Sequence, residues 1–141
     1  MNVTIASPAS IKPKTLECRL GQIDYEPDRI LFFPEGIYGF EQDRRYVLWD
    51  DTRYFPFRWL ISEDNPDIMF PVLDPRLVVP EYTPPWEEPA LDSVLAIVTL
   101  GGENPVTMNL RAPILFSSST RTGKQAILAD SEYPLRYPVS R

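Results

Sequence analysis

Residues 94–100 read Val-Leu-Ala-Ile-Val-Thr-Leu and form the most apolar stretch of the chain. The run is seven residues long and is followed by Gly101-Gly102. That length is short for a helix and ordinary for a strand. An unbroken apolar run of this kind is typical of a strand buried on both faces. The stretch therefore predicts a sheet protein with this strand in its interior.

The prolines before this stretch exclude a long helix. Eight of the sixteen prolines lie between Pro56 and Pro89. A proline inside a helix removes a backbone hydrogen bond and clashes with the preceding turn. The long proline-free windows, at residues 14–26, 35–55, 90–104 and 114–133, each fit strands better than helices.

Further strands are predicted on both sides of residues 94–100. Residues 16–25 alternate in polarity around Gly21, which predicts a hairpin. Shorter apolar runs predict strands over 29–33, 46–49, 57–61, 68–73, 106–110, 114–116 and 125–129. We expect an all-β, small single-domain, β-barrel-like fold of about nine short strands, with at most a short helical turn near residues 86–92. Residues 1–13 are expected to be a flexible N-terminal extension, and residues 14–141 the domain.

The residue counts restrict the possible chemistry. The 141 residues include no histidine and one cysteine, Cys18. A Ser-His-Asp triad, a Cys-His pair and a histidine-ligated zinc site are therefore excluded. Asp64 and Asp67 do not have the spacing of an EF-hand loop. We predict no catalytic residue, no metal site and no cofactor.

Charge is distributed unevenly along the chain. The net charge is −6, and residues 60–110 contain nine acidic residues against one basic residue, Arg76. Such a segment suits contact with a basic partner, but an acidic surface without a partner gives the same pattern. The candidate contact residues in this segment are Glu63, Asp64, Asp67, Glu81, Tyr82 and Glu103.

The location of the protein is inferred from what the sequence lacks. No apolar run approaches the length of a membrane span. The first residues have neither the basic nor the sustained apolar part of a secretion signal. We expect a cytoplasmic protein that binds neither a membrane nor, because of its acidic charge, nucleic acid directly.

Four motifs together resemble one family. The first is residues 33–41, Phe-Pro-Glu-Gly-Ile-Tyr-Gly-Phe-Glu. The second is residues 70–75, Phe-Pro-Val-Leu-Asp-Pro, followed by Glu81-Tyr82. The third is residues 109–114, Asn-Leu-Arg-Ala-Pro-Ile. The fourth comprises Arg121, Gly123, residues 124–128 and Tyr133. These motifs, in this order over residues 15–139, resemble the flagellar assembly factor FliW family.

The resemblance implies a function that depends on binding. FliW proteins form a small barrel-like domain without enzymatic activity. They bind flagellin in the cytoplasm and also CsrA, an RNA-binding regulator that represses flagellin translation. The resemblance implies allosteric antagonism of CsrA and a free protein that is monomeric. It also implies structural roles at turns and strand ends for the motif residues Pro34, Gly36, Gly39, Phe40, Asp74, Pro75, Asn109, Ala112 and Pro113.

Two other functions remain open at this stage. A small-ligand-binding barrel or a carboxylate-using enzyme would need a convergent polar pocket, and the sequence indicates none. Direct RNA binding would use the basic residues of the C-terminal region: Arg111, Arg121, Lys124 and Arg136.

Overall fold

The computed structural model describes residues 13–84, 86, 88–102 and 105–139. The described elements are mostly short strands, with three 3₁₀ turns: η2 (Pro27–Arg29), η3 (Thr52–Tyr54) and η4 (Pro75–Leu77). The strands are β1 (Lys14–Cys18), β2 (Gly21–Tyr25), β3 (Ile30–Phe32), β4 (Arg45–Asp50), β5 (Arg58–Ser62), β6 (Met69–Leu73), β7 (Ser93–Thr99), β8 (Thr107–Met108), β9 (Ile114–Phe116), β10 (Gly123–Gln125) and β11 (Tyr137–Pro138).

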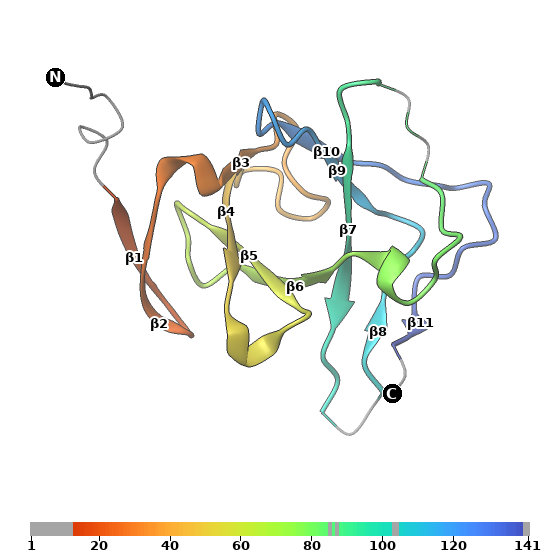
Figure 1. The fold of residues 1–141 in the computed structure, drawn as a ribbon, viewed down its shortest axis with the longest axis horizontal. Coiled ribbons are helices and arrows are strands. Elements are labelled where there is room, and N and C mark those ends of the chain that lie inside the picture. The colour runs from red at the N-terminus through yellow and green to blue at the C-terminus, as the bar shows by residue number, and fades with distance from the viewer. Residues whose placement is uncertain (1–12, 85, 87, 103–104, 140–141) are drawn as a thin grey trace, which may run out of the picture.

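Most of the strands form one curved sheet. Its order is β10-β9-β7-β6-β5-β4-β3, and β8 pairs with both β7 and β11. All of the ladder pairings are antiparallel. The two ends of the sheet meet at an isolated bridge between Phe32 and Thr122, where the Phe32 N–H donates to the Arg121 carbonyl at 2.8 Å. The result is an all-β, barrel-like fold whose edges touch without pairing along their length (Figure 1).

The interior of the barrel is an apolar cluster contributed by most of the sheet. Its buried members include Phe33 after β3, Tyr46 and Leu48 on β4, Leu60 on β5 and Phe116 on β9. Because side chains alternate along a strand, every second residue of β4 faces this interior. A second apolar cluster lies on the other side of β7 and packs β8, β9 and the segment around Tyr82 together.

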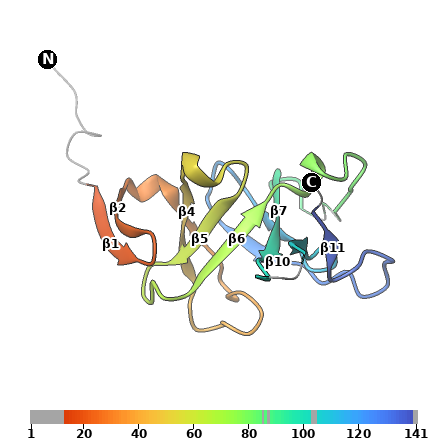
Figure 2. The ribbon, with the colours of Figure 1, turned by 90° about the horizontal axis from the view of Figure 1, so that it is seen from below.

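The hairpin β1–β2 covers the outer face of β4 and β5. Its Leu16 and Ile23 pack against Val47 and Ile61. Both faces of β4 and β5 are therefore covered, which explains the continuous apolar runs at these strands. The hairpin lies at one end of the molecule, and β8 and β11 lie at the other end (Figures 1 and 2).

The structure corrects several details of the predicted pattern. Eleven strands are described, and β11 has no counterpart among the predicted strands because Pro138 is one of its two residues. The strand predicted over 125–129 is instead β10, although the N–H groups of Ala126 and Leu128 still donate to carbonyls of the preceding segment. Near 86–92 the described residues form a turn closed by the Leu91 N–H on the Glu88 carbonyl at 3.0 Å. Residues 1–12 of the predicted extension lie outside the described residues.

Candidate functional site

Glu63 is the most constrained of the candidate contact residues. It follows β5 and accepts hydrogen bonds from the Tyr25 hydroxyl at 2.6 Å, Arg45 Nε at 3.2 Å and Lys14 Nζ at 3.4 Å. Its side chain is 13% exposed. Burial raises the pKa of Glu63, but the bonds from Tyr25 and Arg45 and the charge of Lys14 outweigh burial and hold it below its usual value. Much of its negative charge is therefore compensated within the molecule.

The exposed candidates fall in two separate places. Asp64 and Asp67 are exposed in the loop between β5 and β6, near the hairpin. Glu81 is exposed in the segment after η4. That segment lies away from the hairpin, toward the opposite end of the molecule (Figures 1 and 2). Glu103 lies outside the described residues. The structure therefore brings Glu63, Asp64 and Asp67 together but separates them from Glu81.

Tyr82, the aromatic among the candidate contact residues, is buried. Its side chain is 3% exposed, its hydroxyl donates to the Leu110 carbonyl at 2.7 Å, and its ring lies 4.6 Å from that of Tyr133. Burial, and then the neighbouring Tyr133, raise its pKa. Tyr82 anchors the acidic segment to the second apolar cluster, so it is not available to a partner in this structure.

The motif after β3 forms a tight turn. The Gly36 N–H donates to the Phe33 carbonyl at 2.9 Å, with Pro34 at the second turn position, where its fixed φ is suited. Gly36 and Gly39 have φ values of +74° and +87°. The ring of Phe40 packs edge-on against Phe70 at 5.1 Å.

The other motif residues lie at strand ends. Asp74 ends β6 by accepting a hydrogen bond from the Arg76 N–H at 3.0 Å, and Pro75 is buried beside it. Asn109 Oδ1 accepts from the N–H groups of Arg111 at 2.9 Å and Ala112 at 3.0 Å, which turns the chain into β9. Ala112 and Pro113 are buried, and the Pro113 carbonyl accepts from the Ala126 N–H at 2.9 Å. Their structural role stays a prediction that substitution tests.

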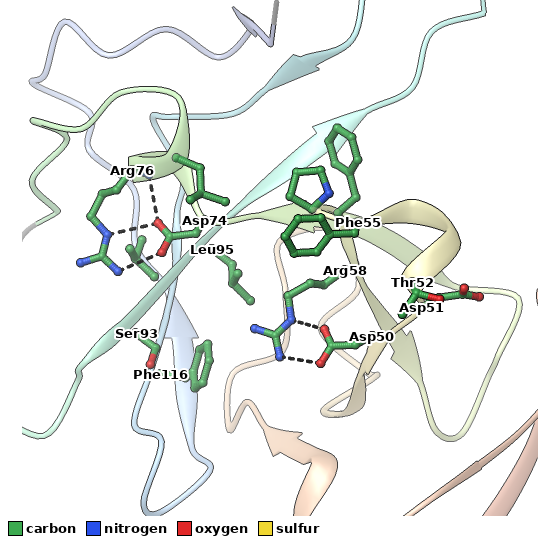
Figure 3. Close-up of a pocket in the computed structure, with 14 residues that line it drawn as sticks. Asp50, Asp51, Thr52, Phe55, Arg58, Asp74, Arg76, Ser93, Leu95 and Phe116 are labelled. Atoms are coloured by element: carbon green, nitrogen blue, oxygen red, sulfur yellow. Dashed lines mark hydrogen bonds and ion pairs between the residues drawn. The ribbon is translucent and has the colours of Figure 1, made fainter. Parts of the chain in front are cut away.

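One mouth of the barrel holds a pocket that the sequence did not indicate. It lies where β4, β6 and β9 end and β5 and β7 begin, and its volume is about 410 Å³. Arg58, bound to Asp50, lies on one side, and Arg76, bound to Asp74, lies on the other (Figure 3). Leu95 and Phe116 line it. We call this cavity the mouth pocket.

Two large apolar side chains beside the mouth pocket are exposed to solvent. Phe55 is 85% exposed and Leu77 is 63% exposed, and both line the cavity. The available sequence signal is the Tyr-Phe-Pro-Phe segment at residues 54–57. The local sequence does not distinguish an exposed aromatic residue from a buried one, so all the aromatic residues of this segment resemble core residues.

Three of the four basic residues considered for RNA binding make contacts within the protein. Arg111 Nε donates to the Tyr133 carbonyl at 2.9 Å, and Lys124 pairs with Glu88 at 3.5 Å. The Arg121 guanidinium lies over the ring of Phe116, 5.9 Å from its centroid. Within the described ranges, no group of three or more His, Cys, Asp or Glu side chains could hold a metal ion. No helix in the described part of the chain is long and apolar enough to cross a bilayer.

Comparison with known proteins decides the family. The model of the family described as FliW protein matches residues 14–139. The chain belongs to the FliW family. The flagellar assembly factor FliW of Thermoanaerobacter pseudethanolicus is 37% identical over 131 residues, covering 84% of this chain and 87% of the relative. That of Thermotoga neapolitana is 34% identical over 134 residues, covering 86% and 90%.

A solved structure agrees with the sequence relatives. The crystal structure of a flagellar assembly factor FliW superposes with a TM-score of 0.81 at 25% identity, covering 91% of this chain and 98% of that chain. The resemblance based on the four motifs is therefore confirmed, and the barrel-like FliW fold is shared. FliW proteins are flagellar assembly factors by name, so this chain is placed among proteins of flagellar assembly.

Proposed function

We propose that this protein acts in the cytoplasm as a non-enzymatic flagellar assembly factor that binds flagellin and the RNA-binding regulator CsrA. Binding of CsrA relieves repression of flagellin translation allosterically, and the free protein is a monomer. The observation that carries the proposal is membership of the FliW family over residues 14–139. The proposal adds the partners and the mechanism to that membership.

The exposed carboxylates support contact with a basic partner. Asp64 and Asp67 project from the loop between β5 and β6, beside the compensated Glu63. Uncompensated surface charges of one sign increase the association rate with a partner of opposite sign and repel partners of the same sign. An acidic loop next to a bound RNA-binding protein would also repel RNA phosphates.

The enzyme alternative has less support from the pocket chemistry. A general acid near neutral pH needs a carboxyl with a raised pKa. Asp50 lines the mouth pocket, and although burial raises its pKa, the bonds and charges of Arg58 and Arg29 lower it overall. Glu63 is also held below its usual value. Both carboxyls are therefore stabilised as anions and suit structural ion pairing.

The test is a titration of the purified protein against CsrA and against flagellin from the same cell, followed by calorimetry and by complex size. We expect a double charge reversal, Asp64→Lys with Asp67→Lys, to weaken CsrA binding by about tenfold or more without loss of thermal stability. Glu132→Lys, an exposed reversal in the C-terminal region, is the matched control. If neither partner binds at micromolar concentration, the proposed function is wrong. If only the double reversal has no effect, the acidic loop is not the contact surface.

A further inference from the structure

We propose that the chain after β10, residues 126–129, is a sheet edge that binds an extended segment of a partner protein as an added β-strand, with a preference for a segment that carries a basic side chain. This edge belongs to a different part of the chain from Asp64 and Asp67. The inference goes beyond the proposed function, because it rests on the backbone and the charges of this edge and not on the identity of any partner.

The backbone after β10 alternates between bonded and free positions. The N–H groups of Ala126 and Leu128 donate to carbonyls of the segment before β9 at 2.9 and 2.8 Å, which continues the antiparallel pairing of β10 with β9. Successive residues of an extended chain direct their backbone polar groups to opposite sides. Those of Ile127 and Ala129 therefore point away from β9. Among the described residues, none bonds to the N–H or the carbonyl of Ile127 or Ala129.

Other contacts mark the two ends of this open edge. At one end, Gln125 Oε1 accepts from the Tyr38 N–H at 2.8 Å, which places the turn after β3 beside β10. At the other end, the Ser131 N–H donates to the Leu128 carbonyl at 3.1 Å and turns the chain. After β10 the chain follows the outside of the molecule toward β11 (Figure 1). The open stretch between the two contacts is residues 126–129.

The edge lacks the features that usually keep another strand away. Natural sheet edges are protected by charged side chains, by proline or by a bulge. Residues 125–129 read Gln-Ala-Ile-Leu-Ala, with neither a charge nor a proline. The side chain of Ile127 is 48% exposed, so apolar surface lies beside the unpaired backbone groups. A strand added here would pair with the backbone and cover this side chain.

A groove of about 790 Å³ gives an extended segment access to the edge. It is lined by residues 124–131, Glu35, Thr83, Pro84 and Tyr133. Of the charged groups in this lining, Lys124 pairs with Glu88. Within the described part of the chain, neither Glu35 nor Asp130 forms an ion pair. A basic side chain on the added strand would be attracted by these two carboxylates, and an acidic one would be repelled.

A segment of a different, basic protein fits the edge better than the other occupants do. The main chain of a strand complements the donors and acceptors of Ile127 and Ala129, whereas a nucleic acid would bring phosphates toward Glu35 and Asp130. A second copy of this chain, pairing through the same edge, would bring its own Glu35 and Asp130 toward those of the first copy. Like charges facing each other across an interface oppose association.

The experiment is an NMR titration of the isotope-labelled full chain with three blocked peptides. The first is Thr-Val-Lys-Val-Thr, the second has glutamate in place of lysine, and the third is the lysine peptide N-methylated at its first valine and at its lysine. With the lysine peptide we expect saturable shifts of the Ile127 and Ala129 amide signals and slower hydrogen exchange of the Ile127 N–H. The glutamate peptide should bind about fivefold more weakly. The N-methylated peptide should bind about tenfold more weakly or worse, because it lacks a donor on each of its edges.

Two variants test the backbone and the charges separately. Ile127→Pro removes the outward N–H without breaking a hydrogen bond of the sheet, and it should abolish binding. Ile127→Val keeps the N–H and is the matched control. The double variant Glu35→Gln with Asp130→Asn should remove the preference for lysine. Glu132→Gln, at an exposed carboxylate outside the groove lining, should leave that preference intact.

The peptides also cover the case in which Ile127→Pro does not fold. The lysine peptide and its N-methylated form, compared on the unaltered chain, then make the same test of backbone pairing.

Four results would overturn the proposal. One is the absence of saturable shifts at millimolar lysine peptide. Another is equal affinity for the lysine peptide and its N-methylated form, which would exclude pairing through the backbone. Equal affinity for the lysine and glutamate peptides would exclude the preference for a basic segment. The fourth is a shift of the Ile127 and Ala129 signals with protein concentration alone, together with a dimer in analytical ultracentrifugation, which would assign the edge to a second copy of the chain.

Discussion

The Tyr25 hydroxyl, on β2, donates a 2.6 Å hydrogen bond to the carboxylate of Glu63, which follows β5. Because Glu63 also accepts from Lys14 on β1 and Arg45 on β4, one side chain joins the outer hairpin to the main sheet. Tyr25→Phe removes the hydroxyl donor and keeps the ring. We expect it to lower the free energy of unfolding by about 1–2 kcal/mol, measured by urea denaturation. Thr15→Ala, which removes the exposed Thr15–Asp24 bond on the same hairpin, should cost less than about 0.5 kcal/mol.

The lowered pKa of Glu63 makes the stability of the hairpin contact depend on pH. A carboxyl whose pKa is lower in the folded state contributes its full stabilisation above the unfolded value, about 4.3 for glutamate. That contribution is lost as the pH falls through the folded value. We expect Glu63→Gln to be less stable than the parent at neutral pH and to approach it as the pH falls toward 3. A stability difference that stays constant over this range would contradict the ionic role. Glu17→Gln, an exposed position on the hairpin, is the control and should follow the parent.

Gly36 and Gly39 share a backbone conformation but differ in surroundings. A Cβ at Gly36 would lie 2.5 Å from the Glu41 Cα and 2.7 Å from its carbonyl oxygen, whereas one at Gly39 would meet nothing within 4 Å. Gly39→Ala should therefore cost only the positive-φ strain, about 1–2 kcal/mol. Gly36→Ala should cost clearly more, because backbone must move. Thermal unfolding of both variants tests this. If both lose the same amount of stability, the close approach to Glu41 adds nothing to the cost of a side chain at Gly36.

The local features of the fold were predictable from the sequence. Alternation around Gly21 predicts the hairpin, and Gly21 does adopt a φ of +102°. The apolar run at 94–100 corresponds to β7, at residues 93–99. Strands of two or three residues, such as β11 at Tyr137–Pro138, were not predictable, because their pairing with β8 is set by distant contacts rather than by local pattern.

The candidate site was less predictable, because partners distant in sequence decide what each side chain does. Glu63 belongs to an acidic segment, yet Lys14 and Arg45, 49 and 18 residues away, compensate its charge. Phe55 stands among aromatic residues that resemble a core but is exposed. The two arginines that line the mouth pocket, Arg58 and Arg76, come from separate segments, and no sequence motif connects them.

Substitutions at the neighbouring residues Glu81 and Tyr82 should distinguish effects on stability from effects on binding. Tyr82→Phe removes the 2.7 Å bond to the buried Leu110 carbonyl. It should lower the free energy of unfolding by about 1–3 kcal/mol, since the carbonyl is left without a partner. Affinity for CsrA, measured well below the melting temperature, should not change, because the side chain is buried. Glu81→Lys is exposed and should have the opposite profile: stability within about 0.5 kcal/mol of the parent and weaker CsrA binding if this end of the molecule contributes to the contact. If Tyr82→Phe weakened binding at unchanged stability, the segment around Tyr82 would have to open when the partner binds, and this result would support Tyr82 as a contact residue.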